Sequence, residues 1–248
     1  MSFLRAKPVA THDFYGPVHK GLRLAQAQLL MRLGACSGED AGELGRLLSD
    51  LVGLLSLAEH HLENEDRWIH AALEARAPGA ADRLAQGHEH HRQSFEELEA
   101  MVGRVETAGA AARPGLLKQL YLRFSLFVAE DLVHMAEEEQ LVLPVLQSLF
   151  SNAELQDIED RIVGGLSPAD MVAFGRFLIP AATRPDRIAL LTAIRANAPA
   201  EAFSAILEHG ARARLSGGDF AHLCAGLGVE IPRAPPAKGE FRWGRIPS

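Results

Sequence analysis

The sequence predicts an all-α protein: an up-down-up-down four-helix bundle followed by a C-terminal extension of short helices. Three observations lead to this prediction. Apolar residues recur at helical spacing through the first 150 residues, helix breakers separate these stretches, and no segment shows the alternation of a strand. Because short connections join the long helices, we expect neighbouring helices to be antiparallel.

Four long helices are expected before residue 150. Gly16-Pro17 opens the first, since proline suits a first-turn position, and Pro78-Gly79 ends the second. Pro144 is expected to kink the last turns of the fourth. The expected ranges are about 17–34, 39–76, 82–107 and 114–150.

The chain divides into three parts by composition. Residues 1–150 form the expected bundle, 151–230 the extension of short helices punctuated by proline and glycine, and 231–248 an extended tail. Ser167, with Asp170 three residues later, resembles a capping box at the start of one short helix. The whole net charge of -7 belongs to residues 1–150. Residues 151–248 could mediate assembly as a homo-oligomer or bind a protein partner.

Composition disfavours several classes of function. The chain has 248 residues and a net charge of -7, so it offers no basic field for nucleic acid. No segment has the length and apolarity of a membrane span or a signal peptide. Cys36 and Cys224 stand far apart, which argues against a disulfide scaffold and fits a reducing compartment. We therefore expect a cytoplasmic protein.

Two helices carry the same interruption of an apolar stripe. In the second, His61 and Glu65 replace core positions, and in the fourth His134 and Glu138 do the same. Residues four apart share one helix face, so each pair is expected to point at the bundle axis. After these pairs the predicted inward positions are Trp68 and Ala72 in the second helix, and Leu141 and Val145 in the fourth.

The other two helices also direct histidine inward. His19 is on the inward line of the first helix, and His91 and His88 are on that of the third. At about 1.5 Å per residue, His19, His61, His91 and His134 converge within about two turns. His70 and His90 are expected to point away from the axis, and Glu139 to lie on a solvated face. Asp131 and Gln26 are expected to hydrogen-bond the site's imidazoles.

Burying these groups without partners would cost roughly 1–3 kcal/mol each, which a bundle stable by roughly 5–15 kcal/mol could not carry. The alternative is a metal-free polar core. A metal removes the difficulty, because imidazole nitrogen and carboxylate oxygen suit iron, manganese or zinc. The two His-x-x-x-Glu segments would place bridging carboxylates around a dinuclear centre.

The sequence resembles the hemerythrin-like (HHE cation-binding) family over about residues 12–150. The resemblance is carried by HHLENEDRWIHAALEARAPG (60–79), HMAEEEQLVLPVL (134–146), VHKGLR (18–23) and HEHHRQSFEELE (88–99). It implies a non-haem di-iron site with Glu65 and Glu138 bridging and four terminal histidine ligands: His19, His61, His91 and His134. Here the third helix has His88-x-x-His91 instead of the His-x-x-x-His of oxygen carriers, so His88 is a candidate fifth histidine ligand.

The resemblance implies a protein that binds O2 or NO for sensing, storage or stress protection. Two alternatives stay open. One is a di-iron oxidoreductase acting on NO, peroxide or an organic substrate. The other is a protein like the iron-centre repair proteins, which the count of four histidines and two glutamates resembles, although their N-terminal cysteine-containing domain is absent here.

Overall fold

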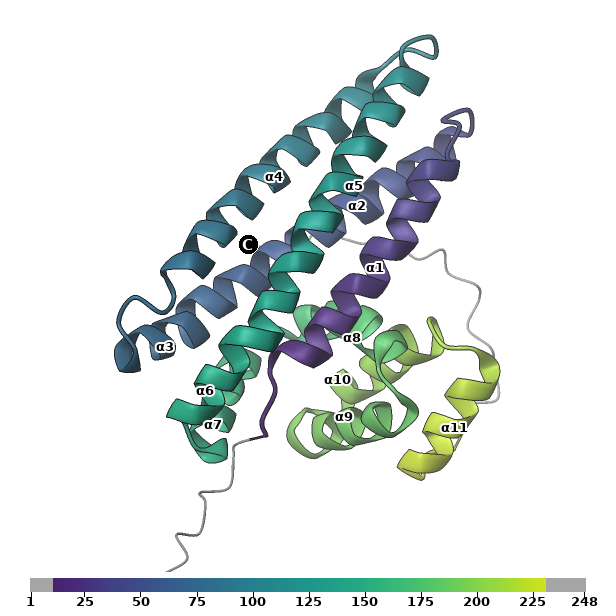
Figure 1. Ribbon diagram of the computed structural model, residues 1–248. Coiled ribbons are helices and arrows are strands. Elements are labelled where there is room, and N and C mark those ends of the chain that lie inside the picture. The colour runs from purple at the N-terminus through teal and green to yellow at the C-terminus, as the bar shows by residue number, and fades with distance from the viewer. Residues whose placement is uncertain (1–10, 231–248) are drawn as a thin grey trace, which may run out of the picture.

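The structure is a computed structural model that describes residues 11–230 (Figure 1). Helices account for nearly all of these residues, and the described part of the chain contains no strand. The all-α prediction is confirmed. The predicted tail, 231–248, lies outside the described residues.

Four long helices run side by side and are joined by short turns (Figure 1). The first and third stretches are single helices close to their predicted bounds, whereas the second and fourth are interrupted. The helices are α1 (Tyr15–Ala35), α2 (Ala41–Asn64), α4 (Asp82–Thr107) and α5 (Arg113–Glu137). Two of the three turns use a glycine with positive φ, Gly38 before α2 and Gly79 before α4.

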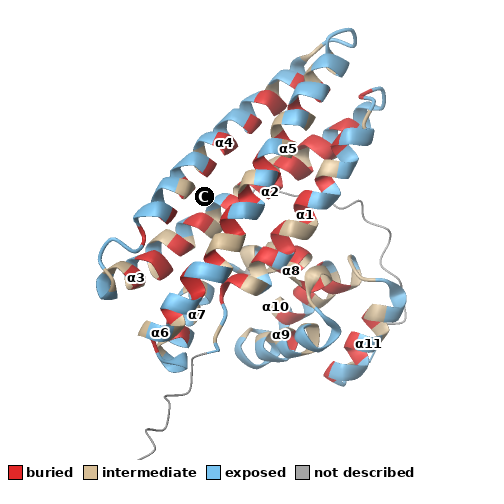
Figure 2. Ribbon diagram, in the orientation of Figure 1, coloured by how far each residue is buried: buried red, intermediate tan, exposed pale blue. Residues whose placement is uncertain are grey.

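The long helices enclose a common apolar core. α1 packs against α2 and α5, and α4 packs against the same two helices. Buried leucines of α2, among them Leu51 and Leu54, meet Phe124 and Phe127 of α5 in one cluster. Figure 2 shows the buried faces turned toward one another and the exposed faces outward. This core occupies the half of the long helices nearer the turns at Gly38 and Gly109.

Two π-helical turns interrupt the long helices at matching places. The second stretch continues from α2 through η1 (Glu65–His70) to α3 (Ala71–Arg76). The fourth continues from α5 through η2 (Glu138–Val142) to α6 (Leu143–Leu149). Pro144 lies in the first turn of α6, after the π turn. The fourth stretch is thus interrupted before Pro144, where the sequence predicted a kink, and the second stretch has a matching interruption without a proline.

The π turns correct the predicted inward positions beyond each glutamate. Ile69 and Leu73 are buried in place of the predicted Trp68 and Ala72, which are half-buried. A π turn inserts one extra residue, so every inward position after it is delayed by one. The same delay in the fourth stretch buries Val142 and Leu146, and leaves the predicted Leu141 and Val145 exposed.

The C-terminal region consists of short helices whose starts are capped as the sequence indicates. Ser167 and Asp170 form the predicted capping box, and Ser151 with Glu154 forms a second. The elements are α7 (Asn152–Gly164), α8 (Pro168–Ala181), α9 (Arg184–Asn197), α10 (Ala200–Ala205), the π-helical η3 (Ile206–Arg212) and α11 (Gly217–Leu227). Helices α8 to α11 enclose a core of their own around Ile179, Leu191 and Ile206.

Two contacts join the C-terminal region to the long helices. Leu155 and Ile158 of α7 lie in a cluster with Leu146 and Phe14, so α7 packs on the end of the long helices. Phe177 of α8 enters the core of the long helices beside α1. It fits only because residue 21 is glycine: a Cβ on Gly21 would lie 2.3 Å from Cδ2 of Phe177.

No single described helix is long and apolar enough to span a membrane. One bent pair, Asn152–Gly164 with Ala169–Ala181, meets the length and composition criteria together, with an angle of 119° between its helices.

Candidate metal centre

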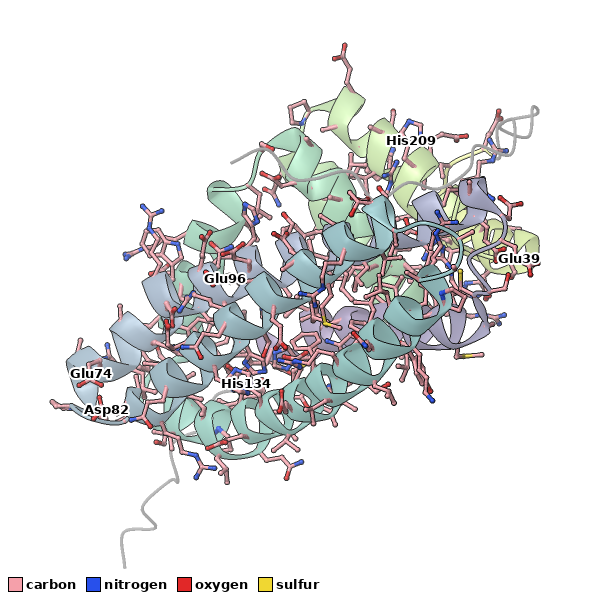
Figure 3. All side chains as sticks on the ribbon, turned by 90° about the horizontal axis from the view of Figure 1, so that it is seen from above. Glu39, Glu74, Asp82, Glu96, His134 and His209 are labelled. Atoms are coloured by element: carbon pink, nitrogen blue, oxygen red, sulfur yellow. The ribbon has the colours of Figure 1, made fainter. Side chains whose placement is uncertain are left out.

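The two predicted His-Glu pairs occupy matching places in the fold. His61 lies in the last turn of α2 and Glu65 begins η1, while His134 lies in the last turn of α5 and Glu138 begins η2. His61 Nε2 is 3.1 Å from Glu65 Oε1, and His134 Nε2 is 3.3 Å from Glu138 Oε1. Figure 3 shows His134 in the interior, between the long helices. Both carboxylates therefore face the space between the helices, as the spacing predicts.

His19 of α1 and His88 of α4 complete the cluster, and both are fully buried. His19 Nε2 lies 3.8 Å from Glu65 Oε1 and 3.4 Å from Glu138 Oε2. His88 Nε2 lies 3.5 Å from Glu65 Oε2 and 3.6 Å from Glu138 Oε1. Glu65 thus directs Oε1 to His19 and His61 and Oε2 to His88, whereas Glu138 directs Oε1 to His134 and His88 and Oε2 to His19.

Three groups of possible donors each have all their atoms within 4.8 Å of one another, and one of them is Asp66, His70 and His88. The other two contain the shared glutamates, one from the α1–α2 hairpin and one from the α4–α5 hairpin: His19, His61 and Glu65, and His88, His134 and Glu138. Because each carboxylate reaches both groups, the geometry is that of two adjacent sites with two shared carboxylates.

The converging atoms lack hydrogen-bond partners among the described residues. Both carboxylate oxygens of Glu65 and of Glu138 are buried without a partner, and so are Nε2 of His19, His88 and His134. Leaving so many buried polar atoms unpaired would cost roughly 1–3 kcal/mol each. Neutral imidazole and carboxylate are the donors that iron, manganese and zinc accept. The residues present therefore fit a dinuclear metal site.

His19 and His88 each donate a hydrogen bond from Nδ1 to a further carboxylate, which orients the ring. Glu139 Oε1 accepts a hydrogen bond from His19 Nδ1 at 3.0 Å, and Arg23 donates two hydrogen bonds to Glu139, at 2.6 and 3.0 Å. With Nδ1 engaged in this way, Nε2 of His19 is left facing Glu65 and Glu138. The position of Glu139 corrects the prediction that it lies on a solvated face.

Asp66 performs the same task for His88. Its Oδ1 accepts from His88 Nδ1 at 2.7 Å, and Arg92 pairs with the same carboxylate. In both halves the orienting acid directly follows the shared glutamate, and the arginine follows the oriented histidine by four residues. The two hairpins therefore repeat one arrangement of donors and supports.

Burial and pairing shift the pKa values within the cluster. Burial, together with the nearby Glu138, raises the pKa of Glu65 well above its usual range. Burial alone would raise the pKa of Glu138 too, but the adjacent imidazoles of His134 and His88 hold it well below its usual value. Burial lowers the pKa values of His19 and His61. His19 and His61 are thus held in the neutral form that binds metal.

His91 lies outside the two donor groups. Its ring centroid is 4.7 Å from that of His134, and its Nε2 is 3.5 Å from Asp131 Oδ1. Burial, and then the neighbouring His134 and His88, lower the pKa of His91 to about 3. Of the two inward histidines of α4, the structure brings His88 to the shared carboxylates and leaves His91 one turn away.

The structure also shows the contacts of Gln26, Asp131 and His70. Gln26 donates its hydrogen bond to Asp131 and not to an imidazole, which corrects the prediction for Gln26, while Asp131 lies 3.5 Å from His91 Nε2. Burial raises the pKa of Asp131 to about 6. His70, expected at the surface, is buried, and its Nδ1 is 3.1 Å from Asp66 Oδ1. The π turn explains this difference, because it delays the inward positions and so turns His70 toward α4.

Two residues outside the predicted ligand set also shape the site. Gly87 precedes His88 in α4, and a Cβ there would lie 3.1 Å from His134 Nδ1. The absence of a side chain therefore leaves room for the imidazole. Tyr15 is fully buried, stacks on His19 with ring centroids 5.3 Å apart, and has a hydroxyl with no partner in the described chain. Burial, and then Glu138 and Glu65, raise its pKa well above the usual value, so the hydroxyl keeps its proton.

No protein-family model, curated protein or solved structure matches this chain. The interpretation of the centre therefore depends on its own geometry.

Proposed function

We propose that the long helices form a hemerythrin-like up-down-up-down four-helix bundle holding a dinuclear non-haem metal centre, with iron as the metal. The observation that carries the proposal is the sharing of Glu65 and Glu138 between the two histidine groups. Four histidines and two carboxylates suit iron, and manganese and zinc accept the same donors. His19, His61 and Glu65 would hold one ion, and His88, His134 and Glu138 the other.

The function we propose is binding of a small diatomic ligand, O2 or NO, for sensing, storage or stress protection in the cytoplasm. Bound iron would supply a redox-active centre with positions open to such a ligand. The chain's contribution is to fix and shield that centre. Glu139 and Asp66 orient His19 and His88, buried core residues exclude water, and the protonated Tyr15 hydroxyl is a hydrogen-bond donor beside the site.

One observation favours a second candidate, an oxidoreductase that acts on an organic substrate. An apolar cavity of about 380 Å³ reaches His61 and Glu65 from the side of the C-terminal helices. A diatomic ligand needs far less space, whereas cavities of roughly 300–1,000 Å³ are typical for small organic ligands.

Metal analysis with optical spectroscopy tests the proposal. We expect about two irons per chain in reconstituted protein, and a near-UV charge-transfer band that responds when the reduced protein meets O2 and then NO. His61→Ala and Glu138→Ala should each abolish both the binding of two irons per chain and the near-UV band. His90→Ala is the matched control, because His90 is an exposed histidine on the same bundle. Full iron content in the His61→Ala and Glu138→Ala proteins would overturn the proposal.

A further inference from the structure

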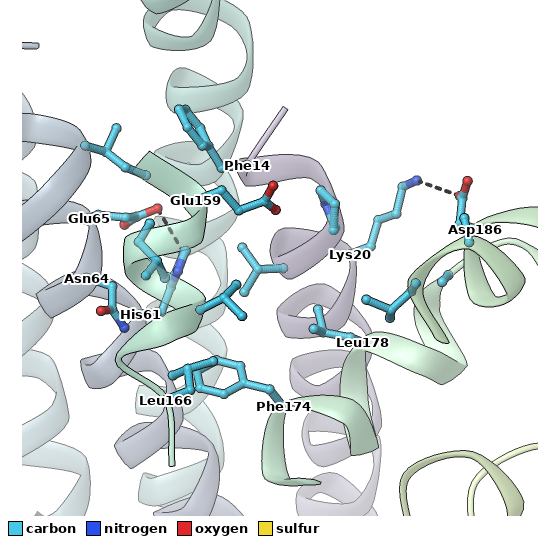
Figure 4. A pocket seen from close by; sticks show the side chains of 18 residues that line it. Phe14, Lys20, His61, Asn64, Glu65, Glu159, Leu166, Phe174, Leu178 and Asp186 are labelled. Atoms are coloured by element: carbon cyan, nitrogen blue, oxygen red, sulfur yellow. Dashed lines mark ion pairs between the residues drawn. The ribbon is translucent and has the colours of Figure 1, made fainter. Parts of the chain in front are cut away.

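A cavity of about 380 Å³ lies between the long helices and the C-terminal helices. Phe14, Val18 and Ile69 line one wall, and Ile162, Leu166 and Phe174 line the other (Figure 4). Apolar side chains form most of the surface. Because the second wall belongs to α7, α8 and the turn between them, the cavity exists only where the two parts of the chain meet.

The inner end of the cavity reaches one of the two donor groups. His61 and Glu65 line it, with the ion pair between them drawn in Figure 4, whereas His88, His134 and Glu138 do not. The side chain of His61 retains 11% of its exposure, in contrast to the fully buried His19. A molecule in the cavity would therefore contact the His61 side of the centre alone.

The charged residues at the outer end already have partners. Lys20 Nζ lies 4.0 Å from Asp186 Oδ2, with both side chains about half exposed (Figure 4). Glu159 Oε2 lies 3.2 Å from His12 Nε2. A carboxylate entering the apolar interior would lose its hydration and find no unpaired positive charge there. The lining therefore selects against carboxylates.

We propose that this cavity binds a neutral, mainly apolar organic molecule whose inner end lies against His61 and Glu65. The inference goes beyond diatomic binding and gives the C-terminal helices a role, since they build half of the site. Binding depends on the apolar walls and not on a metal ion. The cavity proposal can therefore be wrong while the metal proposal is right. The metal proposal can likewise be wrong while the cavity proposal is right, and the two results can be told apart.

Fluorescence of N-phenyl-1-naphthylamine, a neutral apolar probe, tests the proposal on the full chain. We expect saturable enhancement in both the metal-free and the iron-loaded protein, and displacement of the probe by 1-decanol. Decanoate should compete about tenfold or more weakly, because it would bring an unpaired negative charge into the cavity. Equal or stronger competition by decanoate would overturn the proposed ligand class.

Cavity-filling variants locate the binding site. Leu166→Trp enlarges a wall residue, and Ala182→Phe does the same from another point of the lining. Each should weaken probe binding by about tenfold while the helical circular dichroism is retained. Leu122→Trp is the matched control, because Leu122 is 55% exposed on α5 and far from the lining. If either variant folds and binds the probe with unchanged affinity, the cavity is not the binding site.

Histidine-selective NMR of the metal-free protein gives a second readout. Addition of 1-decanol should shift the ring signals of His61, which lines the cavity, and leave those of His209 unchanged. Probe binding without any shift at His61 would contradict the placement of the ligand's inner end.

Discussion

His88 and His91, three residues apart on α4, have different partners in the structure. His88 and His91 differ by about 60° around the helix, so both face inward. His88 is aligned by Asp66 and reaches both shared carboxylates, while His91 packs against His134. In the α1–α2 hairpin, the apolar Leu22 stands three residues after His19, where His91 follows His88. This comparison assigns His91 to the wall of the site.

Leucine substitutions should separate the roles of these two histidines. His88→Leu removes a donor and should reduce iron content from about two per chain to one or none, whereas His91→Leu should keep about two. Iron analysis of both purified variants measures the difference. Loss of iron in His91→Leu with retention in His88→Leu would reverse the assignment.

The titration of His91 predicts a pH dependence of stability in the metal-free protein. Its pKa is about 3 in the folded chain and about 6.5 when unfolded, so between these values the unfolded state binds the additional proton. Its contribution to stability is therefore present above pH 6.5 and is lost as the pH falls toward 3. Relative to His91→Leu, the wild type should lose up to about 2 kcal/mol of unfolding free energy between pH 7 and pH 5.

Urea denaturation of the chelator-treated wild type and variant at pH 7, 6 and 5 measures this difference. Leu122→Ala serves as the control, since Leu122 is exposed on α5 and carries no titratable group. A wild-type and His91→Leu difference that stays constant across these pH values would contradict the prediction.

At the scale of the elements, the π turns are the feature that the sequence predicts least well. They also change which of the later residues face the core. Both begin at a shared glutamate, and each shifts all later inward positions by one residue. Helical periodicity predicts the inward-facing positions correctly up to Glu65 and Glu138, and it places the later ones one residue too early. Through this shift His70 reaches Asp66, and Ile69 and Leu146 enter the core.

The contact between α1 and α8 depends on a glycine. Gly21→Ala would place a Cβ 2.3 Å from the ring of Phe177, so the C-terminal helices should be displaced. We expect a loss of roughly 1–3 kcal/mol in unfolding free energy, as in other overpacked cores. Gly103→Ala is the control, because a Cβ at Gly103 in α4 meets nothing within 4 Å. Chemical denaturation measures both, and equal stability of the two variants would contradict a tight contact at Gly21.

At the scale of the whole molecule, the contacts place α7 with the long helices and α8 to α11 around a separate core. A chain ending after Gly164 should therefore retain about two irons, because no donor lies beyond Glu138. It should unfold more easily by roughly 3–5 kcal/mol, since Phe177 no longer fills the core. Iron analysis and thermal unfolding measure these two quantities.

A chain ending after Phe150 provides the comparison for that truncation. It also lacks Leu155 and Ile158, which are buried against the end of the long helices, and should be less stable than the chain ending after Gly164. Equal stability of the two truncated chains would contradict the placement of α7.

The sequence by itself determined the helical class, the positions of the long helices and the inward direction of His19, His61, Glu65, His134 and Glu138. Spacing suffices for these features because a helix repeats its faces every 3.6 residues and because buried polar groups require partners. The tertiary structure brought His88 to the shared carboxylates and left His91 one turn away, paired Asp66 with His88 and Glu139 with His19, and formed the cavity beside His61. These features depend on small rotations of one helix against another and on contacts between distant residues, which the periodicity of one segment does not contain.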